Sequence, residues 1–155
     1  MADKSILDLL TRISNRINLI IDYPVEVKRV VKGNTTWVYR KYKSGIVKMI
    51  GKRDGNFSVS EWKASGYNYY ADIAGVDLPF TLKELWESKI TLYNDGCYIA
   101  APMQPAGSNT VYGLPSVSYT GGFSMLRCSK PPSTLTYHIT YTVTGLWKSF
   151  GGGTA

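Results

Sequence analysis

The chain of 155 residues carries a formal net charge of +7, and 44% of its residues are hydrophobic. This length suits one domain with a substantial core and a short appendage. No apolar run reaches the roughly 18 residues that a membrane-spanning helix needs, and the N-terminus lacks the basic-then-apolar layout of a secretory signal. We therefore expect no insertion into a membrane, and we expect the chain to be made and folded in a cytoplasm.

The first 22 residues carry a heptad repeat of isoleucine and leucine. Such a seam drives helices to wrap around one another, and isoleucine at every d position favours three or four strands over two. We predict a helical trimerisation stem over residues 1–22, which ends where Pro24 stops the helix. The seam residues are Ile6, Leu10, Ile13, Ile17 and Ile20. The alternative is one amphipathic helix packed on its own domain, because leucines beside the seam widen the apolar face.

After Pro24 the sequence predicts β-structure. Residues 25–31, 35–42 and 46–50 read as strands, and the short links between them can join only antiparallel neighbours. We therefore expect an antiparallel meander over residues 23–53.

The meander carries nine of the 18 lysine and arginine residues, and residues 28–53 include no acidic side chain. The expected basic surface comprises Lys28, Arg29, Arg40, Lys41, Lys43, Lys48, Lys52 and Arg53. Such a strip could face nucleic acid, an anionic cell-surface polymer or an acidic protein, or it could be a solvated sheet face. Nucleic acid is disfavoured because no zinc spacing, RNA-binding signature or recognition helix accompanies the charge.

Residues 54–148 predict a β-sandwich or jelly-roll-like head, followed by a flexible glycine-rich tail over 149–155. The clearest strand is 135–144, where apolar and polar side chains alternate without a break. The expected elements before it are a loop over 51–66, a strand over 67–73, a helical turn over 81–86, strands over 89–93 and 97–101, loops over 104–109 and 119–122, and a strand over 123–128.

Residues capable of catalysis are sparse, and we expect no enzyme activity, no cofactor and no metal. The one histidine, His138, falls on the threonine face of the last strand, where a surface residue is expected. Cys97 and Cys128 have no metal spacing and are expected to be isolated buried thiols, with a disulfide as the alternative. A glycan depolymerase would need two opposed carboxylates, and Glu84 and Glu87 are more simply a solvated face.

Aromatic loops are the more plausible binding surface. Sugar rings present C–H faces that stack on tyrosine, and five tyrosines lie in or beside glycine-rich segments. These candidate glycan-binding residues are Tyr67, Tyr69, Tyr70, Tyr112 and Tyr119. Ordinary core and strand packing is the competing interpretation for each of them.

Three segments are similar to motifs of one known family. Residues 37–48, WVYRKYKSGIVK, resemble the W-Y-R-K-W-x-x-G-W-x-E segment of bacteriophage tail-fibre and baseplate proteins, although Lys48 replaces the usual glutamate. Residues 141–148, YTVTGLWK, resemble the W-Y-x-x-G-x-W-K strand that closes the receptor-binding head, with Tyr141 in place of the Trp-Tyr pair. Residues 78–80, LPF, are similar to the L-P-x-x-F of the same domains. The resemblance implies a non-enzymatic homotrimeric β-sandwich head on a short helical stem.

From the residues and the resemblance together we expect a virion protein, most simply a trimeric tail-fibre or baseplate protein that attaches to host surface glycan. Its partners would be two further copies of itself, other virion proteins and a host cell-surface polysaccharide. The alternative is a trimeric head fibre or capsid decoration protein, which the short stem favours.

Overall fold

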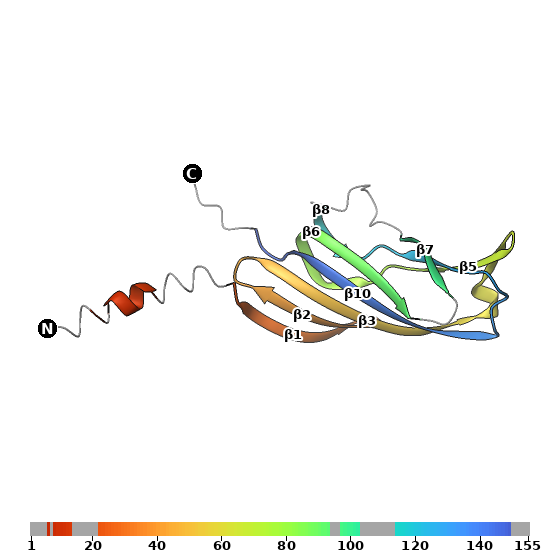
Figure 1. The fold of residues 1–155 in the computed structure, drawn as a ribbon, viewed down its shortest axis with the longest axis horizontal. Helices are drawn as coiled ribbons and strands as arrows, with labels where there is room; N and C mark the ends of the chain where they lie inside the picture. Colours follow the sequence, from red (N-terminus) through yellow and green to blue (C-terminus); the bar gives the residue numbers. More distant parts are fainter. Residues whose placement is uncertain (1–5, 7, 14–21, 94–96, 103–113, 150–155) are drawn as a thin grey trace.

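The fold is mainly β and antiparallel (Figure 1), in a computed structural model that describes residues 6, 8–13, 22–93, 97–102 and 114–149. The strands are β1 (Pro24–Lys32), β2 (Thr35–Tyr42), β3 (Ile46–Ser58), β4 (Lys63–Ser65), β5 (Asn68–Ile73), β6 (Asp77–Tyr93), β7 (Tyr98–Pro102), β8 (Leu114–Tyr119), β9 (Phe123–Arg127) and β10 (Thr134–Leu146). A 3-10 turn, η1 (Val59–Glu61), precedes β4. The strands form a six-stranded sheet in the order β1-β2-β3-β10-β6-β8 and a four-stranded sheet in the order β4-β5-β9-β7.

The last predicted strand is confirmed as β10, and it is the centre of the larger sheet. It pairs with β3 along one edge and with β6 along the other, both antiparallel. Its alternating apolar side chains face inward and are buried, from Leu135 and Tyr137 to Tyr141 and Val143. An uninterrupted period of two is what a strand with one core face and one solvated face requires.

The predicted meander of β1, β2 and β3 is also present, with Gly33 and Gly45 at positive φ in its two turns. Because β3 continues to Ser58 and pairs with β10, the meander belongs to the same sheet as β10, β6 and β8. The boundary that we expected between residues 53 and 54 therefore lies inside a strand.

The six-stranded sheet curls strongly. Tyr39 on β2 packs edge-on against Phe80 at the start of β6, with 5.1 Å between ring centroids, although three strand spacings separate β2 from β6 within the sheet. The four-stranded sheet contributes Ile73, Phe123 and Met125 to the same core. Figure 1 shows β5 and β7 over the end of β10 that lies away from the N-terminus.

The helical turn expected over 81–86 is wrong, because these residues belong to β6. Trp86 is an extra residue in the ladder: Leu85 pairs with Gly145, while Glu87 pairs with the preceding Thr144. Such a β-bulge shifts the alternation by one residue. Leu82 and Leu85, which both precede the bulge, are buried, and their spacing of three imitates a helical face.

The loop expected over 51–66 is also wrong in part, since β3 extends to Ser58 and β4 follows η1. Glycines inside β3 produced this error. Gly51 lies between Trp37 and Tyr141 on the neighbouring strands, and an added Cβ at Gly51 would meet the Trp37 ring at 2.8 Å. At Gly55 it would meet the Tyr137 ring. These glycines make room for aromatic rings within a continuous strand.

The predicted N-terminal helix is described only at residue 6 and residues 8–13, which are helical. The seam residues Ile17 and Ile20 and the expected tail from residue 150 onward lie outside the described residues. The coiled-coil stem stays a prediction.

Candidate binding face

The outer face of the six-stranded sheet collects exposed side chains from five strands. On β2 and β3 the odd-numbered positions from Trp37 to Met49 point into the core, so the even-numbered positions point outward. Strand alternation therefore selects which of the basic residues reach this face. The outward residues include Val38, Arg40, Lys48, Ile50 and Lys52.

The register aligns these side chains in rows across the sheet. Arg40 is opposite Lys48, which is opposite Thr144 on β10. The next row joins Val38, Ile50 and Thr142, and the third joins Thr36, Lys52 and Thr140. The face thus changes from mixed aliphatic and cationic on β1, β2 and β3 to threonine-rich on β10.

We call the cationic part the basic patch, defined by Val27, Arg29, Val38, Arg40, Lys48, Ile50 and Lys52. Its aliphatic members are exposed, and a shallow hollow of about 290 Å³ is lined by Arg29, Val38, Ile50, Lys52 and Thr36. Among the residues that the structure describes, its four cations form no ion pair. Like charges directly opposed on neighbouring strands are destabilising, so the Arg40–Lys48 pair marks this patch as suited to an anionic partner.

A second hollow, the His138 hollow, lies beside the basic patch. It has a volume of about 550 Å³ and is lined by Lys52, Asp54, Tyr93, His138, Ile139 and Thr140. In the sheet register His138 is opposite Asp54 on β3 and Tyr93 on β6, and His138 Nδ1 lies 2.7 Å from Asp54 Oδ1. The Tyr93 side chain is 61% exposed. The sequence prediction included His138 only as a surface residue and did not include Tyr93 or Asp54.

Four residues of the predicted basic surface lie elsewhere. Lys41 points to the inner side of the sheet, where its side chain is 18% exposed and its Nζ lies 2.8 Å from Glu26. Arg53 donates to the carbonyl of Ala74, and Lys43 lies over the ring of Tyr23. Lys28 is exposed but shares its side of β1 with Glu26, in register with Tyr39. The strip that is continuous in sequence is therefore divided between the two faces of the sheet.

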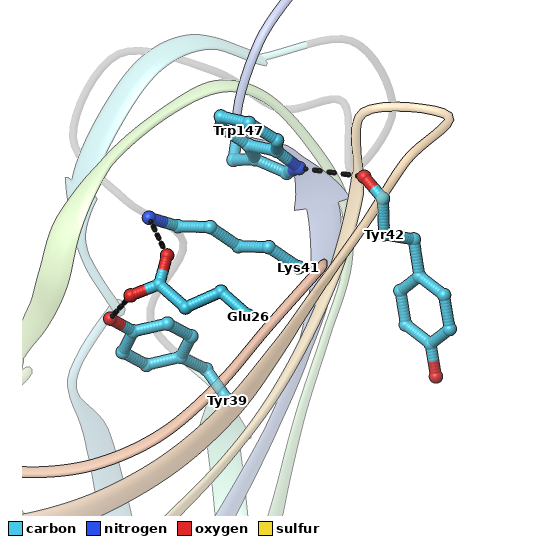
Figure 2. A network of polar contacts seen from close by, with 5 residues as sticks. All are labelled: Glu26, Tyr39, Lys41, Tyr42 and Trp147. Carbon is cyan, nitrogen blue, oxygen red and sulfur yellow. Dashed lines mark hydrogen bonds and ion pairs between the residues drawn. The ribbon is translucent and has the colours of Figure 1, made fainter. Parts of the chain in front are cut away.

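Figure 2 shows the inner polar cluster around Glu26. Its carboxylate accepts a hydrogen bond from the Tyr39 hydroxyl at 2.7 Å and pairs with Lys41, while the Trp147 indole donates to the Tyr42 carbonyl at 3.1 Å. The hydrogen bonds from Lys41 and Tyr39 lower the pKa of Glu26. Burial and the hydrogen bond to Glu26 raise the pKa of Tyr39 to about 12. The Lys41 ammonium also lies 4.4 Å from the Phe80 ring centroid, so the cluster ties β1 and β2 to β6.

This cluster predicts a loss of stability at alkaline pH. Because the folded-state pKa of Tyr39 is raised from 10 to about 12, its contribution is complete below pH 10 and is lost as the pH rises toward 12. We expect Tyr39→Phe to cost about 1 kcal/mol of unfolding free energy at pH 7 and to flatten the decline between pH 10 and 12. Urea unfolding across this range measures both effects. Tyr67→Phe, at a tyrosine that is 97% exposed, is the matched control and should show the wild-type dependence of unfolding free energy on pH. The same decline between pH 10 and 12 in Tyr39→Phe and in the wild type would contradict the role of Tyr39 in this pH dependence.

The predicted glycan-binding tyrosines do not form one cluster. Tyr67 lies in the turn between β4 and β5, Tyr69 and Tyr70 are half-buried on β5, and Tyr119 is at the end of β8 in the other sheet. Tyr69 packs against the core, which agrees with the competing interpretation for that residue. Tyr112 lies outside the described residues.

The described seam residues Ile6, Leu10 and Ile13 are all exposed, Leu10 at 56%. Cys97 and Cys128 are free thiols, as expected, but Cys128 is exposed rather than buried. Burial raises the pKa of the Cys97 thiol. Glu84 and Glu87 lie on β6 and not on a helix.

The described residues thus define an antiparallel two-sheet β domain with an exposed basic and threonine-rich face. None of the helical residues in the described ranges forms a segment long and apolar enough to cross a membrane. No protein-family model matches the chain, and no curated protein matches it. A solved structure of the P. aeruginosa R1 pyocin fibre, comprising its C-terminal residues 323–701, is similar at a TM-score of 0.35 and 15% sequence identity, over 79% of this chain and 28% of that one. The chain therefore spans less than a third of the length of that fibre fragment.

Proposed function

We propose that this chain is a non-enzymatic virion protein: a trimeric tail-fibre or baseplate protein whose β domain attaches to a host surface glycan. The observation that carries the proposal is the exposed apolar seam. Ile6, Leu10 and Ile13 follow one another along one side of a helix, and the described β domain leaves each of them substantially exposed. Exposed apolar side chains at heptad spacing favour association with copies of the same helix over packing on the chain's own domain.

The second support comes from the sequence segments that resemble phage tail proteins. Residues 37–48 form most of β2, the following turn and the start of β3, and residues 141–148 form the end of β10 and the two residues after it. These segments are neighbours in the fold: Thr144 is opposite Lys48, and Trp147 donates to the carbonyls of Gly45 and Tyr42. The two motifs therefore form one corner of the large sheet, near the point where the chain enters from its N-terminal segment.

Attachment would work through avidity. Three shallow sites on one axis could engage a repeating polymer together, and the linkage raises the effective concentration of the second and third sites. The basic patch would add attraction to anionic polymers that decreases as salt concentration rises.

The experiment is a surface-binding assay with purified bacterial polysaccharides, including lipopolysaccharide O-chains, teichoic acids and capsular polymers. We expect the full-length chain to bind at least one polymer and to dissociate markedly faster after removal of residues 1–22. If the chain binds none of these polymers, the result would contradict receptor attachment. The alternative, a head fibre or capsid decoration protein, would then be the better account of a trimer.

A further inference from the structure

The His138 hollow brings together residues that lie far apart in the sequence. Asp54, Tyr93 and His138 come from three neighbouring strands, β3, β6 and β10, and the register places them side by side on the outer face. We propose that this hollow binds an acidic saccharide, with a sugar ring stacked on Tyr93 and an anionic group directed toward Lys52. The inference rests on the proposed function and deepens it by naming the part of the surface that contacts the glycan.

Tyr93 supplies the platform for a sugar ring. It stands at the end of β6 on the outer face, and most of its surface is exposed. A tyrosine ring combines an apolar face with a hydroxyl at its edge, which matches the C–H face and hydroxyl rim of a pyranose. Apart from the His138 imidazole, Tyr93 supplies the one aromatic ring among the described residues that line the hollow.

Hydrogen-bonding groups surround this ring. Asp54 Oδ1 is hydrogen-bonded to His138 Nδ1, and Asp54 Oδ2 has no partner among the described residues. The His138 Nε2 and the Thr140 hydroxyl are likewise unpaired within the described part of the chain. The hollow thus offers an acceptor, an imidazole nitrogen and a hydroxyl, each free to bond to sugar hydroxyls. The contact with Asp54 Oδ1 leaves the His138 Nε2 directed away from Asp54, toward the ligand side of the hollow.

Charge selects an acidic saccharide over a neutral one. Lys52 lines both hollows, and Arg29 lies farther along the smaller one. Neither cation forms an ion pair within the described residues. Tyr93 on β6 and Lys52 on β3 are separated by two strand spacings and by two residues along the strand direction, which together give about 12 Å between their backbones. A carboxylate on the sugar next to the stacked ring can therefore reach Lys52, and a longer chain can continue toward Arg29.

The test uses the single histidine of the chain, because its imidazole signals are unambiguous in a ¹H–¹³C NMR spectrum. The probes are tetrasaccharides of hyaluronan, polygalacturonate and polysialate, with uncharged chitotetraose as the comparison, each titrated to millimolar concentration into the full-length protein. We expect saturable shifts of the His138 signals with at least one acidic probe. No shift with any of the three would overturn the proposal.

Variants assign the contacts. Tyr93→Ala should weaken binding of the acidic probe by about tenfold or more, whereas the matched control Tyr23→Ala, at an exposed tyrosine just before β1, should leave it unchanged. Lys52→Gln should lower the affinity for the acidic probe and leave any binding of chitotetraose unchanged. Equal affinities of Tyr93→Ala and wild type would overturn the stacking, and equal losses for both kinds of probe in Lys52→Gln would overturn the charge selection.

The same variants separate this inference from the proposed function. If the full-length chain binds a bacterial polysaccharide surface and Tyr93→Ala binds it equally well, the attachment role stands and the His138 hollow is the wrong site. If the wild-type chain binds no such surface, the attachment role itself fails, whatever the hollow does with tetrasaccharides.

Discussion

Gly51→Ala is expected to lower the free energy of unfolding by about 2 kcal/mol or more. The Cβ of alanine would lie 2.8 Å from ring carbons of Trp37, which is fully buried and also packs against Tyr141 with 6.0 Å between ring centroids. The indole cannot rotate away without displacing the core, so the strand or the ring must shift. Urea unfolding monitored by tryptophan fluorescence measures the cost.

Two comparisons identify the cause of that loss. Gly66→Ala, at a turn with positive φ and nothing within 4 Å, should cost only the left-handed strain of about 1 kcal/mol. Combining Gly51→Ala with Trp37→Leu should cost less than the two single losses added, because the smaller side chain makes room for the methyl group. Strict additivity would show that the ring contact is not what the alanine disturbs.

For the trimer that we propose, Leu10→Lys is expected to abolish assembly at concentrations where the wild-type chain assembles. The substitution would place three ammonium groups at one level of the proposed seam, where burial without a counter-charge is costly. Thr11→Lys adds the same charge on the next residue, away from the seam, and should leave the trimer intact. Analytical ultracentrifugation over a range of concentrations compares the two variants.

Circular dichroism supplies the control for Leu10→Lys, because the β domain should keep its wild-type spectrum. Equal behaviour of Leu10→Lys and Thr11→Lys would contradict the seam as the assembly device.

How much of the fold can be predicted from the sequence depends on the regularity of each strand. β10 alternates without interruption, and the β1–β3 meander has short glycine-containing turns, so both are predictable. The bulge at Trp86 and the ring-covered glycines at Gly51 and Gly55 break the local pattern for tertiary reasons. Only the neighbouring strands explain why these residues belong to β-structure.

The candidate site was predictable only in part. The basic character of residues 28–53 is plain from the sequence, and strand alternation could have separated outward Arg40, Lys48 and Lys52 from inward Lys41. The His138 hollow could not be predicted, because it depends on the register of β10 against both β3 and β6. Tyr93 is one of twelve tyrosines, and no sequence signal distinguishes it from the others.

The central claim, a trimer held by the N-terminal seam, is tested most directly by the mass of the intact protein in solution. Native mass spectrometry of the full-length chain should give three chains of 17.2 kDa each, and removal of residues 1–22 should give a single chain with the β domain still folded. A single-chain mass with residues 1–22 in place would contradict the claim and with it the avidity on which the attachment mechanism depends.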